Sequence, residues 1–495
     1  MFVIKKVFLL STIVAALLFS GCKAGLFGSD GVPVASQPQA APEPVVVNGM
    51  RTSYADVVEK TSPAVVRIEA EHKEKASPTQ FSLPDDLFHQ FGIPRQNQRP
   101  QIARGLGSGV VVQANGTIMT NYHVVEGAEK ITVMMNDNKT YEAKVVGTDE
   151  PSDLAVIKID ADNLPFLTLG NSDNVRVGDI VLAIGNPLGI GQTVTAGIIS
   201  AKGRRTGLSD GSYEDFLQTD APINRGNSGG ALVNLNCELI GINSQILSPG
   251  GASGGNIGIA FSIPSNMAKS VLDQLLKDGK VHRGMLGVSV QNITDDTAKA
   301  LDIKDRNGVL VSGVQNGSAA EKAGVKRGDI ITAVNDEKIE DSNVLRNKVA
   351  ETMPGTQVKL TIVRDGKEMD LTATLDEFKP SDAKKQGNDE GDDENGVAPQ
   401  NQGGKLGLSL QPVTPQTAKQ LGLDSAEGMV VTEVDPDGPA ADEGVTRGDV
   451  ILEINKKPVN SIGDVKSALD AAGDKTILLL VSRRGQTIYL TVKPG

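Results

Sequence analysis

The chain has 495 residues, of which 39% are hydrophobic, and a formal net charge of -12. This length exceeds what one hydrophobic core usually supports and predicts about three domains. The acidic balance argues against general nucleic-acid binding, which needs a basic face. The 55 glycines and 3% aromatic residues favour β-rich domains with many turns over helical bundles.

The N-terminal segment 1–21 has the composition of a secretory signal peptide, with lysines ahead of an apolar run at 7–19. This run is too short to cross a membrane comfortably, so we expect an exported protein. The following "LLFSGC" resembles a bacterial lipoprotein signal, in which Cys22 would be acylated. Lys23 then favours the outer membrane, whereas a plain cleaved signal would give a soluble periplasmic protein. Residues 22–50, rich in Pro, Ala and Ser, are predicted to be a flexible tether.

The segment 51–280 alternates short β-branched runs with glycine-containing turns, which predicts an antiparallel barrel or sandwich. A polar stretch rich in Pro and Gln, residues 72–105, interrupts the pattern, and long loops of this kind are usually functional or disordered. Helical spacing of Met267, Val271 and Leu275 predicts a helix that closes the domain.

A sequence pattern within 281–378 recurs within 405–495. Gly287 and Gly407 occupy matching places, as do Asn335 and Asn455, and the offset between the copies is constant. Such regular self-similarity indicates two copies of one small domain. The charged, glycine-rich stretch 379–404 between them has almost nothing apolar to bury, which predicts a disordered acidic linker.

The stretch "INRGNSGGALVN" places Ser228 among glycines, which fits either a surface turn or a nucleophile. A serine hydroxyl needs a base held by a carboxylate. His123 ends a β run and Asp153 precedes an apolar strand, so His, Asp and Ser occur in this order within one β-rich domain. The backbone N–H groups of Gly226 and Ser228 would form an oxyanion hole.

The glycine pattern around Ser228 also fits the nucleophile elbow of α/β hydrolases. That fold needs parallel α/β patterning and a histidine after the serine. The only later histidine, His282, lies beyond the predicted closing helix. The serine protease interpretation is therefore favoured, and it requires no cofactor and no metal ion.

The motifs "TNYHVV", "SDLAVIKI" and "QTDAPINRGNSGGALVN" closely resemble those of the HtrA/DegP family of exported serine endoproteases, over residues 52–495. The resemblance implies a mainly β fold, with a chymotrypsin-like double β-barrel followed by two small α+β PDZ domains. It implies a triad of His123, Asp153 and Ser228 that degrades misfolded envelope proteins without ATP under stress, cutting after small aliphatic residues. It also implies homo-oligomers, as trimers or larger assemblies.

Two loops acquire roles through the same resemblance. The insert 72–105 would be a regulatory loop that crosses between subunits. The stretch "SAKGRRTGLSDGSYEDF" would be a sensor loop that couples PDZ occupancy to the active site, with Arg204 or Arg205 as contacts. Cys237 departs from the family pattern, which has glycine in this hairpin turn, so a retained turn should be strained there.

PDZ domains capture a C-terminal carboxylate in a backbone nest and add the peptide as a strand to a sheet edge. Two glycines between apolar residues fit such nests, although they also fit simple strand starts: Leu286-Gly287-Val288 and Leu406-Gly407-Leu408. Binding is expected mainly at the first copy. The RGD tripeptides at Arg327 and Arg447 are interpreted as structural turns.

Three functions remain in competition. The first is an endopeptidase that degrades unfolded exported proteins. The second is mainly a chaperone with latent protease activity, and the third is a PDZ scaffold with an inactive barrel. A complete triad argues against the scaffold. It does not separate the first two functions, because loops can hold a complete triad inactive.

Overall fold

The computed structural model describes residues 46–47, 50–73, 102–187, 191–206, 213–247, 255–301, 303, 306–379, 405–421, 423, 425–473, 475–483 and 485–493. The signal peptide, Cys22, most of the tether and the linker therefore lie outside the described residues. The chain divides into the units Met1–Ser53 and Tyr54–Gly495. In the first unit, β1 (Val46–Val47) pairs with β2 (Met50–Arg51).

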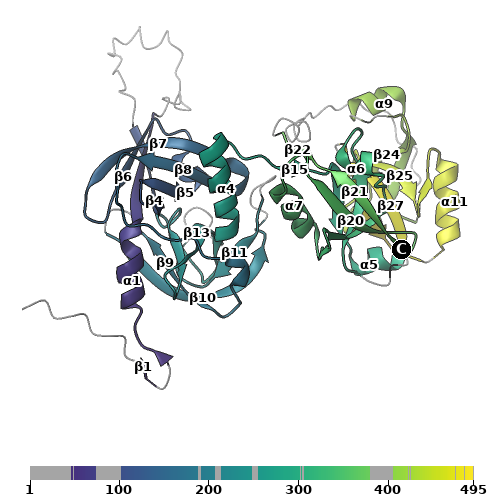
Figure 1. Cartoon of the computed structure of the whole chain (residues 1–495). Coiled ribbons are helices and arrows are strands. Elements are labelled where there is room, and N and C mark those ends of the chain that lie inside the picture. The colour runs from purple at the N-terminus through teal and green to yellow at the C-terminus, as the bar shows by residue number, and fades with distance from the viewer. Residues whose placement is uncertain are drawn as a thin grey trace, which may run out of the picture. The chain divides into compact units, whose positions relative to one another are not determined.

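Six antiparallel strands form the first closed barrel of the second unit (Figure 1). Their order is β3 (Val65–Lys73), β4 (Ile102–Gln113), β5 (Thr117–Thr120), β8 (Leu154–Ile159), β7 (Thr140–Asp149) and β6 (Lys130–Met134). Short helices flank them: α1 (Ala55–Thr61), η1 (Ser62–Ala64), α3 (Tyr122–Val125) and η2 (Glu150–Ser152). The β-branched and other apolar residues of these strands fill the interior, as the strand LAVIKI shows, in which only Lys158 is not fully buried.

The segment between β3 and β4 is shorter than the insert 72–105 that the sequence predicts. β3 and β4 pair as far as Lys73 with Ile102, so both ends of the stretch 72–105 are regular strand. Backbone hydrogen bonding between the strands prevails there over the polar composition. Residues 74–101, which the sequence assigns to a regulatory loop, lie outside the described residues.

A second closed barrel has the strand order β10 (Thr193–Arg204), β11 (Phe216–Thr219), β14 (Ala260–Pro264), β13 (Leu239–Ile246), β12 (Ala231–Asn234) and β9 (Ile180–Gly185). The turn η3 (Ser172–Asn174) precedes it, and α4 (Ser265–Asp278) follows it. Met267, Val271 and Leu275 are buried on α4, which confirms the predicted helix. One apolar cluster contains residues of both barrels, so the two barrels share a core.

The main sheets of the two repeats have the same strand order, which confirms the predicted duplication. The first contains β15 (Gly284–Met285), β16 (Val288–Asn292), α5 (Asp295–Ala300), β17 (Val309–Val314), α6 (Ala319–Ala323), β18 (Ile330–Val334), β19 (Glu337–Lys338), α7 (Ser342–Glu351), β20 (Gln357–Arg364), β21 (Lys367–Thr374) and β22 (Asp376–Glu377). The second contains β23 (Leu408–Pro412), α9 (Pro415–Gln420), β24 (Met429–Val434), α10 (Pro439–Asp442), β25 (Val450–Ile454), β26 (Lys457–Pro458), α11 (Ile462–Ala472), β27 (Ile477–Arg483) and β28 (Gln486–Val492).

The main sheets of the repeats follow the orders β16-β17-β18-β20-β21 and β23-β24-β25-β27-β28. Both RGD tripeptides form turns ahead of a strand, and their aspartates are buried. Asp329 accepts hydrogen bonds from Arg364, as Asp449 does from Arg483. An aspartate held inside its own domain is unavailable for adhesion, which confirms the structural interpretation.

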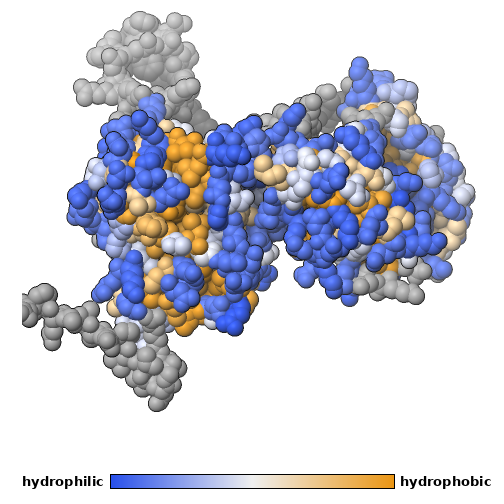
Figure 2. Space-filling view, in the orientation of Figure 1, coloured by the Kyte–Doolittle hydropathy of each residue, from blue (hydrophilic) through white to orange (hydrophobic). Residues whose placement is uncertain are grey.

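Two surface features follow from this arrangement. Cys237 has a φ of 63°, and its N–H donates to the Asn234 carbonyl at 3.1 Å, so the hairpin turn is retained with a strained residue. Figure 2 shows apolar surface among polar surface over the barrels. The exposed large apolar side chains of the described residues include Phe166, Val177 and Ile198. No helix in the described part of the chain is both long and apolar enough to cross a membrane.

Candidate active site

His123 and Asp153 meet at one end of the first barrel. His123 lies on α3, directly after β5, and Asp153 lies between η2 and β8 with a φ of 53°. The imidazole Nδ1 is 2.9 Å from each carboxylate oxygen of Asp153, and the backbone N–H of His123 donates to the same carboxylate at 3.1 Å. The carboxylate thereby fixes both the ring and its backbone, which leaves Nε2 as the nitrogen available for a proton from substrate chemistry.

Ser228 approaches this pair from the second barrel, on the loop between β11 and β12. Its hydroxyl donates to the Ser244 carbonyl at 3.0 Å. The hydroxyl of Ser244, on β13, donates to Asp153 at 2.8 Å. Ser244 therefore connects the serine and the carboxylate, and no motif in the sequence singled it out.

The loop around Ser228 is held by Ser108 of β4. The Ser108 hydroxyl donates to the Gly226 carbonyl at 2.6 Å, and its N–H donates to the Ser228 carbonyl at 2.8 Å. A Cβ at Gly229 would lie 2.2 Å from the Ser108 carbonyl oxygen, so this close approach requires glycine. A buried serine within a strand has no distinctive sequence pattern, so no motif marks Ser108 in the sequence.

The N–H groups of Asn227, Gly229 and Gly230 donate to carbonyls within 3.0 Å. Within the described residues, the backbone N–H groups of Gly226 and Ser228 donate to no backbone carbonyl. Two free donors beside a serine, a histidine and a carboxylate can stabilise a developing oxyanion. The arrangement can therefore support acyl transfer.

Comparison with known proteins gives the family. Residues 107–242 match a trypsin-like peptidase domain, and residues 284–375 and 430–483 each match a PDZ domain. The chain is 41% identical over 478 residues to a probable periplasmic serine endoprotease DegP-like of Chlamydia trachomatis, covering 93% of this chain and 92% of the relative. The chain belongs to the DegP-like, HtrA-type family of serine endoproteases.

Other relatives agree with this placement. A probable periplasmic serine protease do/HhoA-like of Haemophilus influenzae is 40% identical, with 90% of this chain and 92% of the relative covered. The solved structure of the HtrA-type protease AlgW with tripeptide is 41% identical, covers 67% of this chain and 99% of its own, and has a TM-score of 0.55. The chain is thus a serine endopeptidase with a chymotrypsin-like double barrel and two PDZ domains, and its relatives are named periplasmic.

The first PDZ domain of this DegP-like protein has a groove of about 420 Å³ between β16 and α7, whose lining includes Gly287, Val288 and Leu345. Gly287 has a φ of 77°. The Leu286 carbonyl accepts from Ala320 N–H at 2.8 Å, and the Gly287 carbonyl accepts from Gln315 N–H at 2.9 Å. Because trans peptide N–H groups point opposite to their carbonyls, the N–H groups of Gly287 and Val288 point away from these partners.

The second PDZ domain repeats this geometry. Gly407 has a φ of 71°, and its carbonyl accepts from Asp435 N–H at 2.9 Å. The Leu406 carbonyl accepts from Ala440 N–H at 3.2 Å. Leu408 begins β23 and is buried in the core of the domain, whereas its counterpart Val288 is only partly buried.

A buried ion pair joins the protease domain to the first PDZ domain. Arg283 donates to Asp149 at 2.6 Å, and its guanidinium lies 4.6 Å from the ring centre of Tyr213.

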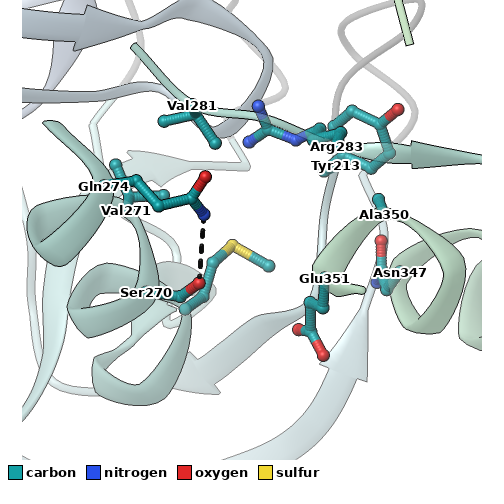
Figure 3. A pocket seen from close by; sticks show the side chains of 10 residues that line it. Tyr213, Ser270, Val271, Gln274, Val281, Arg283, Asn347, Ala350 and Glu351 are labelled. Carbon is teal, nitrogen blue, oxygen red and sulfur yellow. Dashed lines mark hydrogen bonds between the residues drawn. The ribbon is translucent and has the colours of Figure 1, made fainter. Parts of the chain in front are cut away.

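Figure 3 shows Arg283 and Tyr213 beside a small cavity of about 30 Å³, which α4 and the C-terminal part of α7 line. Glu351 of α7 also lines it, and burial raises the pKa of this carboxyl, with Asp215 adding repulsion. Burial likewise raises the pKa of Asp215 to about 6, with Asp173 adding repulsion.

Hydrogen bonds continue from α7 toward the active site. The side-chain amides of Asn343 and Asn347 donate to the Glu214 carbonyl at 2.8 and 2.9 Å. The Glu214 carboxylate accepts from Thr206 N–H at 2.6 Å and from its hydroxyl at 2.9 Å. Gln245, which follows Ser244 on β13, donates to the Thr206 hydroxyl at 3.1 Å.

Of the two sensor-loop arginines, Arg205 lines the groove of the first PDZ domain. Arg204 instead donates to Gln218 on the neighbouring strand β11 at 3.1 Å. The hydrogen-bonded path through Glu214 and Thr206 was not visible in the sequence, because its members are separated by long stretches of chain.

Proposed function

We propose that this DegP-like protein hydrolyses misfolded or unfolded exported proteins through an acyl-enzyme formed on Ser228. The single observation that carries the proposal is that Ser244 hydrogen-bonds to both Ser228 and Asp153, while Asp153 holds His123. The Ser228 hydroxyl leaves the Ser244 carbonyl and attacks the scissile carbonyl carbon. Its proton passes to His123 Nε2, which then protonates the leaving amine.

The remaining steps use the same groups in reverse. The oxygen of the tetrahedral intermediate accepts hydrogen bonds from the N–H groups of Gly226 and Ser228, and collapse of the intermediate releases the amine and leaves the acyl-enzyme. Water, deprotonated by His123, then attacks the ester and regenerates the Ser228 hydroxyl. No metal ion or cofactor takes part in this scheme.

The test is the Ser228→Ala variant. It removes the nucleophile without removing core packing, so turnover of unfolded casein should fall by about 10⁶-fold. A fluorophosphonate probe should label the wild type and leave the variant unlabelled. Cleavage by the folded variant at near the wild-type rate would refute the mechanism.

The alternative, a chaperone with latent protease activity, is separated by the same variant. If holding of unfolded protein is a major activity, Ser228→Ala should still suppress aggregation of a denatured substrate at stoichiometric amounts. We propose hydrolysis as the main activity, because the relatives of this chain are named as serine proteases and because hydrogen bonds join Ser228, Ser244, Asp153 and His123.

We further propose that the first PDZ domain binds the C-termini of substrates or activators at Gly287 and Val288. Support comes from the groove and from the HtrA-type structures named with a tripeptide and a decapeptide. Gly287→Val would place a Cβ 2.3 Å from Ser318 Cβ and should abolish binding, whereas Gly407→Val should matter less. Calorimetry that gave equal affinities for a free-acid peptide and its amide would refute carboxylate capture.

Occupancy of the groove would reach the active site along the path through Asn347, Glu214 and Thr206 or through Arg205. Glu214→Gln should weaken stimulation of proteolysis by the peptide without weakening peptide binding. Equal stimulation of the variant and the wild type by the peptide would exclude the path through Glu214.

The proposed location is the periplasmic face of the outer membrane, with Cys22 lipidated and residues 22–50 as the tether. Two acyl chains would anchor the protein firmly, since each buried CH₂ contributes about 0.8 kcal/mol. Cys22→Ser should move the protein into the soluble periplasmic fraction. A mature N-terminus that begins beyond Cys22 and carries no lipid would contradict this location.

We also propose that the protein forms homo-oligomers. Light scattering should then give the mass of a trimer or of a multiple of a trimer.

A further inference from the structure

The peptide groove of the first PDZ domain has a wall that comes from the second PDZ domain. Besides β16 and α7, its lining includes Gln486, Thr487 and Ile488, the first three residues of β28. A ligand in this groove would therefore lie beside a strand of the other domain.

This wall is held firmly against the first domain. The side-chain amide of Gln291 on β16 donates to the Tyr489 carbonyl at 3.0 Å, and its oxygen accepts from Tyr489 N–H at 2.7 Å. The Thr487 hydroxyl donates to the Ser312 carbonyl at 2.7 Å. An apolar cluster from both domains closes the junction, with buried Leu310, Ile330, Leu478, Leu480 and Tyr489. Burial on this scale favours one fixed position of β28.

The wall lies on one defined face of β16. A Cβ placed on Gly313 would lie 2.5 Å from Thr487 Oγ1 and 3.6 Å from the Cβ of Ser289, which pairs with Gly313 across the strands. The side chain of Ser289 therefore shares its face with β28. Val288 and Val290 pack on the opposite side, against the core of the domain.

A peptide added to the free edge of β16 alternates its side chains between these two faces. Its C-terminal side chain lies on the side of Leu345 and Val349, which line the groove. The penultimate and fourth-last side chains then point to the face of Ser289 and β28. This placement rests on the proposed capture of a C-terminal carboxylate.

We propose that β28 of the second PDZ domain selects the penultimate and fourth-last residues of peptides bound to the first. The three lining residues of β28 carry no charge, so this wall itself favours neither sign of charge at these two ligand positions. The second PDZ domain thus acts as a specificity element for its neighbour, independently of any peptide that it binds itself.

The test uses the full chain with Ser228→Ala, which prevents cleavage of the ligand. Three free-acid decapeptides share a terminal valine and carry alanine, glutamate or lysine at both the penultimate and the fourth-last position. Fluorescence anisotropy at physiological salt measures each dissociation constant. Gln486→Glu introduces a charge into the wall, and Gln416→Glu, at an exposed position of α9 outside the groove lining, is the matched control.

Gln486→Glu should weaken the glutamate peptide and strengthen the lysine peptide by about three- to fivefold each, the size of a partly exposed charge pair. The alanine peptide and all three peptides on Gln416→Glu should be unaffected. Unchanged preferences in Gln486→Glu, with binding still abolished by Gly287→Val, would overturn the wall while leaving carboxylate capture intact. Failure of every peptide to bind, or binding that survives Gly287→Val, would refute capture by the first PDZ domain and the wall together.

Discussion

Replacing Ser244 with alanine tests how the two barrels cooperate in catalysis. The variant removes a hydroxyl that donates to Asp153 at 2.8 Å, and it retains the backbone carbonyl that accepts from Ser228. Asp153 keeps its contacts with the ring and the N–H of His123. The substitution therefore loosens the carboxylate without dismantling the proposed triad.

The magnitude follows from the kind of hydrogen bond that is lost. A hydrogen bond to a charged group contributes about 1.5–3 kcal/mol, equivalent to about 10- to 150-fold in rate if it acted entirely on the transition state. Because Asp153 keeps its other two donors, we expect the lower end, about a tenfold fall in kcat with little change in KM. Asp153→Asn, which removes the negative charge, should be far more severe, at about 10⁴-fold.

The assay is hydrolysis of an internally quenched peptide, normalised by titration of active sites. Ser262→Ala is the matched control, because the Ser262 hydroxyl is also buried in the second barrel and donates to Asn243 at 2.9 Å, away from Asp153. Its stability should fall while kcat per active site stays unchanged. A kcat of Ser244→Ala within twofold of wild type, or an equal loss in both variants, would refute the positioning of Asp153 by Ser244.

Three further predictions concern stability. The raised pKa values of Asp215 and Glu351 make the folded state bind more protons than the unfolded state, so stability should fall as pH rises from about 4 through about 6. The wild-type Tm should therefore be lower at pH 7.5 than at pH 5.5, and Asp215→Asn should reduce this difference. A wild-type Tm that does not change over this pH range would contradict the prediction. Cys237→Gly should be about 1 kcal/mol more stable to denaturant than Cys237→Ala, since only glycine relieves the positive φ, and equal stabilities would exclude strain there. Arg283→Met should lower the free energy of unfolding by about 3–5 kcal/mol by leaving Asp149 buried without its ionic partner. Adding Asp149→Asn, which removes the charge and keeps an oxygen that accepts from Ser152, should restore part of this loss, and no recovery in the double variant would contradict the ion-pair explanation.

The linear sequence determined the parts of this protein whose signals are local. Strand and turn patterns, the constant offset between the repeats, and the motifs around His123, Asp153 and Ser228 each lie within a short stretch of chain. The same holds for the positive φ at Cys237, because the surrounding turn residues fix the backbone there. These features needed no knowledge of which elements touch.

Tertiary structure alone decided which distant residues support the local motifs. Ser108 and Ser244 are ordinary strand serines until barrel closure places one on the Ser228 loop and the other between Ser228 and Asp153. The contact of Arg283 with Asp149 depends on domain packing in the same way. The physical reason is that hydrogen bonding and burial act over a few ångströms in space, whereas these partners are far apart along the chain, so no periodicity or motif records their pairing.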